Sequence, residues 1–191
     1  FRKRILCEIE NMLFGRFHMY AQVYNNPKGL GVDFVIQSIF RRIKHLYLNK
    51  FKFVDKYSLL HMFKPYLESR QFTYKELLKL DDSIFFTFLE SIQYEKDKIL
   101  QNLFKAYHNS SLITVKENTK KQKINAKGDE KYYYGNIDCK KISVYHKDED
   151  PIYIYDAANN DKVSELSKVS SVIKKMSAVE ITPRYIVKIK H

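Results

Sequence analysis

The most informative segment of the chain is Phe14-Gly-Arg-Phe-His-Met-Tyr-Ala-Gln-Val-Tyr-Asn-Asn-Pro-Lys28. If this segment is helical, Arg16, Tyr20 and Tyr24 recur every four residues and project from one face. Apolar or aromatic side chains cover most of the remaining circumference, so the pattern predicts a largely buried helix. A buried guanidinium needs an anionic partner, which is either a carboxylate elsewhere in the fold or the phosphate or carboxylate of a ligand. Spacing alone favours the structural ion pair.

Two parts of the sequence, in the same order, resemble the HD-domain phosphohydrolases. The first is Glu10-Asn-Met-Leu13 followed by residues 16–28, which is similar to the helix after the metal-binding core in the deoxynucleoside triphosphate triphosphohydrolase branch. The second is Leu80-Asp-Asp-Ser-Ile84, where that family has a leucine, one or two acidic or polar residues, and then a helix. The resemblance covers most of the chain and thins after Ser111.

The resemblance implies roles for five residues. Arg16 would neutralise phosphate oxygens of the substrate, Tyr20 falls where some relatives have a histidine close to substrate, and Tyr24 matches a tyrosine beside the sugar or base. Arg2 and Arg4 match basic residues that help bind an activating nucleotide in regulated members of the family. For these two, solvated charges near a chain end are the alternative interpretation.

HD enzymes are named after an adjacent His-Asp pair that helps to bind a divalent metal. No His-Asp dipeptide occurs in this sequence, and its histidines show no metal-ligand spacing. The histidines are His18, His45, His61, His108, His146 and His191. We therefore expect no catalytic residue and no metal ligand in this chain, which would be inactive alone. Because the chain starts with Phe1 and inside a helical pattern, we expect a fragment whose missing N-terminal HD core binds Mg, Mn, Fe or a similar metal. A degenerate relative is the alternative.

The composition indicates an anionic partner and a cytoplasmic protein. A net charge of +12 suits a nucleotide or nucleic acid, although a solvated lysine-rich surface would give the same value. Cys7 and Cys139 are too few for a disulfide framework and indicate reduced thiols. No apolar run has the length of a transmembrane segment, and no secretory signal pattern is present.

The hydrophobic pattern predicts a mainly α fold with a C-terminal α+β subdomain, that is, a helical bundle followed by a small antiparallel sheet with one helix. Residues 1–110 would complete an HD-type core, and residues 111–191 would form the subdomain, with a mobile lysine-rich loop at 118–130. We predict helices over 2–26, 31–49, 82–92 and 96–108, a connector over 51–70, and a capping box from Thr73 to Glu76. We predict strands over 112–116, 131–134, 142–145, 151–155 and 185–189, a turn at 157–161, and one helix over 163–176.

These observations predict the C-terminal portion of a metal-dependent phosphohydrolase that acts on nucleotides. The resemblance further implies a homo-oligomer, and the lack of a long apolar run indicates no membrane association. Two alternatives remain: a basic, tyrosine-rich module that binds nucleic acid, which is less favoured, and an assembly domain without catalytic activity.

Overall fold

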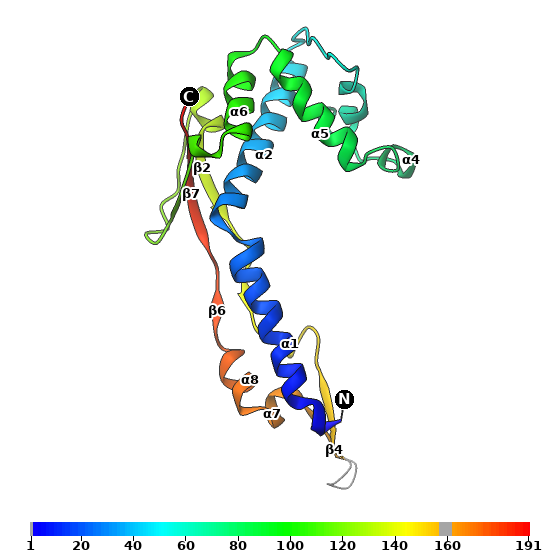
Figure 1. Ribbon diagram of the computed structural model, residues 1–191, viewed down its shortest axis with the longest axis vertical. Helices are drawn as coiled ribbons and strands as arrows, with labels where there is room; N and C mark the ends of the chain where they lie inside the picture. The colour runs from blue at the N-terminus through cyan, green and yellow to red at the C-terminus, as the bar shows by residue number, and fades with distance from the viewer. Residues whose placement is uncertain (1, 157–161) are drawn as a thin grey trace. The chain divides into compact units, whose positions relative to one another are not determined.

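The computed structural model describes residues 2–156 and 162–191. Helices dominate the part before residue 110, and short antiparallel strands with short helices follow it, as the fold class predicted (Figure 1). The chain forms two compact units. Unit 1 combines residues 1–26 with 138–184, and unit 2 combines residues 27–137 with 185–191. The domain boundary predicted near residue 110 stays a prediction.

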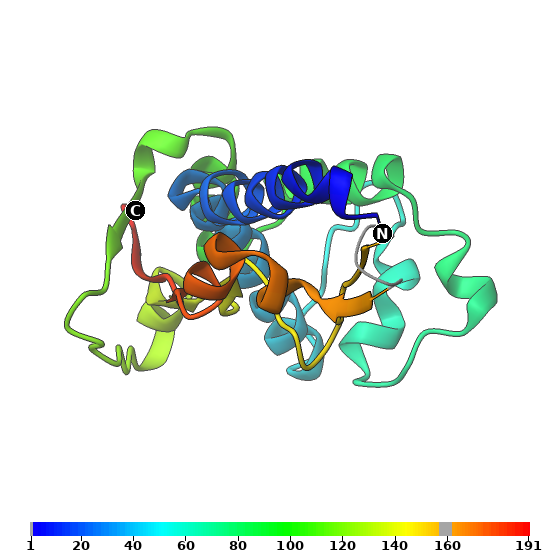
Figure 2. The ribbon, with the colours of Figure 1, turned by 90° about the horizontal axis from the view of Figure 1, so that it is seen from below.

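Unit 1 begins with one continuous helical segment made of three kinds of helix. A 3-10 turn, η1 (Lys3–Ile5), leads into α1 (Leu6–His18), and α1 continues as a π-helix, η2 (Met19–Tyr24). Figure 2 shows α1 beside the short helices α7 (Leu166–Val169) and α8 (Ser171–Met176). One face of α1 packs into a small core that is shared with these helices and with β4. The buried members of this core are Ile9, Leu13, Val144, Tyr145, Ile154, Leu166 and Ile173.

Two small antiparallel sheets complete unit 1. One pairs β3 (Ile142–Ser143) with β6 (Glu180–Ile181), and the other pairs β4 (Tyr153–Asp156) with β5 (Lys162–Glu165). The turn predicted at 157–161 lies outside the described residues.

The single helix predicted over 163–176 is wrong. Its first residues form β5, because they pair with β4 and Val163 lies opposite Tyr155. Ser170 then interrupts the helical part with an extended backbone, φ −96° and ψ 112°. Its hydroxyl accepts a hydrogen bond from the Ile173 N–H at 2.9 Å, so Ser170 caps α8 instead of continuing α7.

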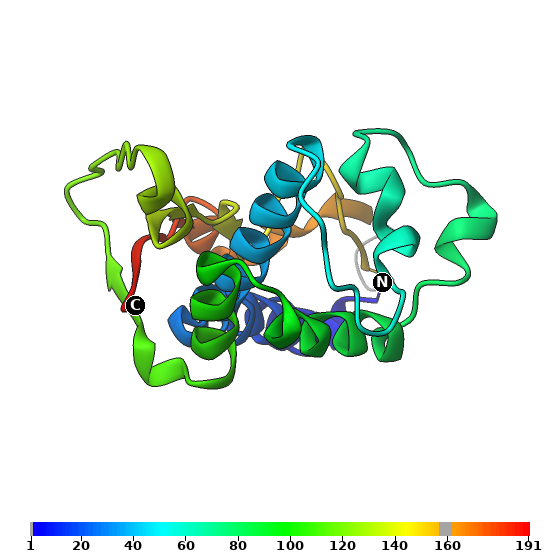
Figure 3. The ribbon, with the colours of Figure 1, turned by 90° about the horizontal axis from the view of Figure 1, so that it is seen from above.

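Unit 2 is built around α2 (Pro27–Leu48), which packs along α6 (Lys98–His108) (Figure 3). The helix begins at Pro27, earlier than predicted, because proline is well suited to the first turn of a helix. Its buried face supplies Phe34, Val35, Ile39 and Ile43 to the larger core. The remaining helical elements of this unit are η3 (Leu60–Phe63), α3 (Lys64–Leu67), α4 (Tyr74–Leu77), α5 (Asp82–Ser91), η4 (Ile92–Tyr94), η5 (Ser110–Leu112) and η6 (Gly128–Tyr132).

The capping box predicted at Thr73 and the helix predicted from residue 82 are confirmed. The Thr73 hydroxyl accepts a hydrogen bond from the Glu76 N–H, and the Glu76 carboxylate accepts one from the Thr73 N–H, which completes the capping box of α4. The Asp81 carboxylate accepts a hydrogen bond from the Ile84 N–H at 2.8 Å and caps α5.

A three-stranded sheet lies against α2. Its order is β1 (Ile113–Glu117), β7 (Arg184–Ile189), β2 (Tyr134–Asp138), with β1 and β7 antiparallel. A Cβ atom added at Gly31 of α2 would lie 2.8 Å from the side chains of both Ile113 and Val115, so glycine permits this close approach. The strand predicted over 131–134 is wrong, because Lys131 and Tyr132 belong to η6 and β2 starts only at Tyr134.

Candidate functional site

Arg16, Tyr20 and Tyr24 lie one after another along α1 and η2. The Arg16 guanidinium carbon is 5.8 Å from the centroid of the Tyr20 ring, within the range of a cation–π contact. The Tyr20 and Tyr24 rings are 5.1 Å apart with their planes inclined by 44°. The three side chains, which we call the Arg–Tyr stripe, therefore form a contiguous row of one cation and two aromatic rings.

The π-helix gives the stripe its local geometry. The Asn25 N–H donates to the Tyr20 carbonyl at 3.2 Å, which is the five-residue spacing of a π-helix. A π-helix turns less per residue than an α-helix, so residues four apart remain close in direction. Short π-helical segments are frequent at functional sites. The sequence pattern predicted a helix here but contained no signal for its π-helical end.

The prediction that this helix is largely buried is wrong. Tyr20 is 43% exposed and Tyr24 62% exposed, and Arg16 is exposed as well. Ile9 and Leu13 are the buried residues of α1, because the strands and short helices of unit 1 cover a single side of the helix. Leu6, Phe14 and Phe17 pack against the core but stay partly exposed. Three apolar side chains, Met12, Met19 and Val23, are exposed too. No carboxylate of the described residues forms an ion pair with Arg16.

Arg2 and Arg4 lie at the start of unit 1, and both are exposed. The backbone of Arg2 forms a parallel bridge to Tyr155 of β4, which places the start of the chain beside this strand. Among the described residues, neither arginine contacts the Arg–Tyr stripe.

An open hollow of about 760 Å³ lies on the β4–β5 hairpin of the same unit. Its lining residues are Lys147, Asp148, Pro151, Tyr153, Lys162, Val163, Ser164, Glu165 and Lys168. The lining contains three lysines and two carboxylates, and one of the carboxylates already accepts hydrogen bonds from neighbouring residues. Glu165 accepts a hydrogen bond from the Tyr145 hydroxyl at 2.7 Å and others from the N–H and hydroxyl of Ser167. Burial alone would raise the pKa of Glu165, but these hydrogen bonds lower it overall.

The described side chains can be compared with the donor sets that bind metals. Among residues 2–156 and 162–191, no three His, Cys, Asp or Glu side chains are grouped so that they could hold an ion. The residues described here therefore offer no donor set for the divalent metal of an HD-type enzyme. Within the same residues, no helix is long and apolar enough to cross a bilayer.

With this geometry established, the chain can be compared with known proteins. The crystal structure of a phosphohydrolase from Bacteroides thetaiotaomicron superposes on the whole chain with a TM-score of 0.76 at 18% sequence identity. The chain has the fold of part of a phosphohydrolase. It covers 52% of that protein, and at this identity the likeness concerns the fold alone.

Three curated relatives are similar in sequence, and each is an uncharacterized protein. The chain is 35% identical over 121 residues to a protein of Mycoplasma pneumoniae and 34% identical over 122 residues to one of Mycoplasma genitalium. YwfO of Bacillus subtilis is 23% identical over 184 residues. The matches span only 28% of each Mycoplasma protein and 42% of YwfO, so the chain corresponds to less than half of each relative. No protein-family model matches the sequence.

Sequence reasoning missed the most buried ion pair in unit 2. Arg42 of α2 pairs with Asp97, which also caps α6, and the Tyr132 ring lies 5.3 Å from the guanidinium carbon. Burial raises the pKa of Asp97, but hydrogen bonds from Arg42 and from the Leu100 N–H outweigh it and lower the pKa overall. Asp97 was recognisable as a residue that precedes a helix, whereas nothing in the sequence marks Arg42 as its partner.

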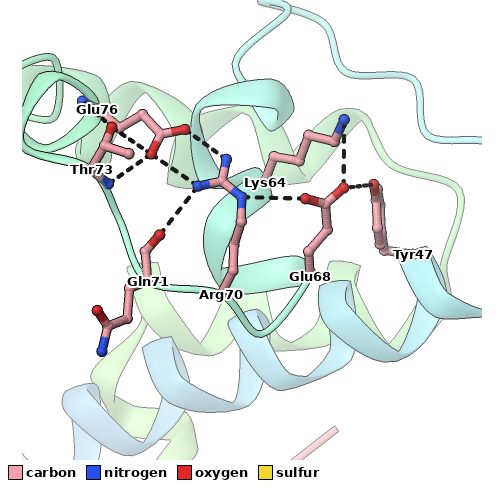
Figure 4. Close-up of polar contacts among 7 residues, drawn as sticks. All are labelled: Tyr47, Lys64, Glu68, Arg70, Gln71, Thr73 and Glu76. Atoms are coloured by element: carbon pink, nitrogen blue, oxygen red, sulfur yellow. Dashed lines mark hydrogen bonds and ion pairs between the residues drawn. The ribbon is translucent and has the colours of Figure 1, made fainter.

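A second polar group surrounds the exposed helix α4. Figure 4 shows the Arg70 guanidinium between the carboxylates of Glu68 and Glu76, with Nη2 2.6 Å from Glu76 Oε1. Glu68 also contacts Lys64 and accepts a hydrogen bond from the Tyr47 hydroxyl at 3.4 Å. Arg70, together with the hydrogen bonds from Thr73, lowers the pKa of Glu76 to about 2. This network fixes the position of α4 and has the features of a structural element, because every member is paired.

Proposed function

We propose that this chain is part of a metal-dependent phosphohydrolase that acts on nucleotides, similar to the deoxynucleoside triphosphate triphosphohydrolases. The observation that carries the proposal is the exposed Arg–Tyr stripe, on a chain that has the fold of part of a phosphohydrolase. In this proposal the stripe lines the substrate pocket.

Each member of the stripe has a role that its geometry supports. The Arg16 guanidinium is exposed and makes no ion pair among the described residues, so its fork of N–H groups is available to donate to phosphate oxygens. The adjacent Tyr20 ring restricts the directions in which Arg16 can point. Tyr24, at the exposed end of the row, offers a ring face to a sugar or base.

Arg16 would act mainly on the transition state. Negative charge on the phosphate oxygens shifts during hydrolysis, and a positioned cation that donates to them lowers the barrier more than it strengthens ground-state binding. The divalent metal of the proposal, Mg, Mn, Fe or similar, would be held by residues outside the described ones. Arg2 and Arg4 are proposed to contact an effector nucleotide, since both are exposed cations beside β4.

The test is nucleotide hydrolysis by the protein expressed from its entire reading frame. Phosphate or triphosphate release is measured with each deoxynucleoside triphosphate in the presence of Mg²⁺ or Mn²⁺, and compared with an Arg16→Ala variant. Removing one transition-state donor lowers kcat by about 100- to 1000-fold in comparable sites, and we expect a loss of this order. Arg41→Ala is the matched control, because Arg41 is an exposed arginine of α2 whose guanidinium donates to the Ser38 hydroxyl and lies near the Phe34 ring.

Two results would overturn the proposal. One is the absence of nucleotide hydrolysis with every metal and nucleotide tried, and the other is full activity in an Arg16→Ala protein that keeps the circular dichroism and melting temperature of the wild type. Equal losses in Arg16→Ala and Arg41→Ala would also contradict a specific role for Arg16.

A second candidate function is assembly, because Met12, Met19 and Val23 are exposed near the stripe. If this apolar surface is covered by another copy of the protein, Met19→Lys combined with Val23→Lys lowers the mass measured by light scattering at a given concentration. An unchanged mass would remove this candidate.

A further inference from the structure

The lysine-rich segment after β1 has a defined structure. Asn118 is buried, and its side chain donates to the Gln122 carbonyl at 2.7 Å and accepts from the Gln122 N–H at 2.9 Å. The Lys121 N–H donates to the Asn118 carbonyl at 3.2 Å, which closes a turn. The predicted mobile loop is therefore held at its start by one buried asparagine.

A second asparagine attaches the same segment to the sheet of unit 2. The Asn136 side chain, from β2, accepts from the Ile124 N–H at 2.7 Å and donates to the Gln122 carbonyl at 2.8 Å. The neighbouring Gly135 faces Phe34 of α2, so Asn136 points to the opposite, outer face of the sheet. The segment is thus fastened on the side of the sheet that α2 does not cover.

Five exposed lysines belong either to the outer face of the strands or to the segment fastened to it, and we call them the lysine platform: Lys116, Lys120, Lys121, Lys123 and Lys188. Lys116 and Lys188 belong to it because their strand neighbours Val115 and Val187 face α2, and side chains alternate along a strand. None of the five forms an ion pair with a carboxylate of the described residues. The platform is therefore a set of uncompensated positive charges on a hydrogen-bonded frame.

Lys121 has an uncommon backbone. Its φ of 50° lies in the left-handed region, which disfavours side chains with a Cβ atom and suits glycine. Glycine could therefore replace Lys121 without strain in the backbone, which makes this position suitable for a variant that removes one charge.

We propose that the lysine platform binds the phosphate backbone of nucleic acid without reading its sequence. A chain of phosphates can contact several of these lysines at once, and release of counterions favours such binding. Between residues 95 and 152, all of which the structure describes, no large apolar side chain is exposed. Insertion into a membrane needs such side chains, so an anionic polymer in solution suits the platform better than a lipid surface.

The test is the fluorescence anisotropy of a labelled 30-nucleotide single-stranded DNA of mixed sequence, titrated with the whole 191-residue chain at several KCl concentrations. The first variant combines Lys120→Gln, Lys121→Gln and Lys123→Gln. We expect its affinity at low salt to fall about tenfold or more, and the slope of log Kd against log salt to decrease by about 2, or roughly 0.7 for each lost phosphate contact. The matched control combines Lys168→Gln, Lys174→Gln and Lys175→Gln, three exposed lysines of unit 1. It removes the same charge and should change the affinity less than about twofold.

Two further variants separate charge from loop geometry. Lys121→Gly removes one platform charge where glycine suits the backbone, and should weaken binding several-fold without unfolding the loop. Asn136→Ala leaves the charge unchanged but releases the loop, so we expect weaker binding with an unchanged salt slope.

The proposal is overturned if the wild type does not bind the DNA at low salt, or if the platform and control variants lose affinity equally. Equal affinity of Asn136→Ala and the wild type for the DNA would contradict a role in binding for the hydrogen bonds from Asn136 to Gln122 and Ile124. These variants do not touch the Arg–Tyr stripe, so nucleotide hydrolysis tests the proposed function separately.

Discussion

Arg42 and Asp97 form a bidentate ion pair, with Nε 3.1 Å from Oδ1 and Nη2 2.7 Å from Oδ2. Their side chains are only 13% and 11% exposed, and they join α2 to the first turn of α6. Paired buried charges add little stability over a well-packed apolar pair, but the loss of one partner leaves the other charge unpaired. The ion pair therefore makes the packing of α2 on α6 sensitive to either residue.

We expect Asp97→Ala to lower the free energy of unfolding by about 3–5 kcal/mol, because it removes the buried partner of Arg42, leaves only the exposed Asp129 at 3.5 Å, and removes the cap of α6. Urea denaturation followed by circular dichroism measures this difference. Asp82→Ala, at the exposed start of α5, removes the same kind of side chain and should cost less than about 1 kcal/mol. If the two variants lose similar amounts of unfolding free energy, the buried Arg42–Asp97 pair is no more important for stability than an exposed carboxylate.

Gly31→Ala and Gly29→Ala are expected to have opposite effects within one helix. The added Cβ at Gly31 would meet two β1 side chains at 2.8 Å, so α2 and β1 must move apart, at a cost of about 1–3 kcal/mol. Gly29 has no atom within 4 Å of the added Cβ, and alanine there should stabilise the helix by about 0.5–1 kcal/mol. The melting temperatures of the two variants, compared with that of the wild type, test this prediction. A higher melting temperature for Gly31→Ala would contradict the described packing of α2 on β1.

The contribution of Glu76 to stability should depend on pH. Arg70 and the hydrogen bonds from Thr73 lower the pKa of Glu76 from 4.5 to about 2 in the folded protein. A carboxyl with a lowered folded-state pKa stabilises the fold above its unfolded-state pKa, and this contribution is lost as the pH falls through the folded-state value. The unfolding free energies of wild type and Glu76→Gln should therefore differ above pH 4.5 and converge as the pH falls toward 2. A difference that is constant from pH 7 to pH 2 would refute this.

Tyr145 should stabilise unit 1 through its hydroxyl. The hydroxyl donates to Glu165 and accepts from the Ile152 N–H at 2.8 Å, so Tyr145→Phe leaves both groups without this partner. We expect a loss of about 1–3 kcal/mol at pH 7 by chemical denaturation. Burial, with a further contribution from Glu165, raises the pKa of Tyr145 from 10.0 to about 12. The stabilising effect of the hydroxyl is thus complete below pH 10 and is lost as the pH rises toward 12. The free energies of unfolding of the wild type and Tyr145→Phe should therefore converge over that range.

Local signals in the sequence were sufficient to predict much of the helical part of the fold. The capping box at Thr73 and the cap at Asp81 depend on residues three apart, and both were predictable because the interacting groups are close in the chain. The same reasoning failed for β5, since Lys162–Glu165 forms a strand only through pairing with β4. Such pairing depends on tertiary contacts and overrides the helical spacing of the apolar residues.

The candidate site was only partly predictable for a similar reason. Four-residue spacing placed Arg16, Tyr20 and Tyr24 on one face, and the structure brings their side chains into a row. The exposure of that row, however, depends on which side of α1 the rest of unit 1 covers. The hydrogen bonds that hold the segment of the lysine platform could not be predicted from the sequence either. Gln122 and Asn136 are 14 residues apart and meet only when β2 joins the sheet.

The position of β7 has a consequence for synthesis on the ribosome. β7 lies between β1 and β2, although it follows both of them in the chain. The two outer strands emerge first and have no partner between them until residues 184–189 have been translated. During that interval β1 and β2 expose unpaired backbone edges, which makes the nascent chain a candidate substrate for chaperones that protect such edges from aggregation.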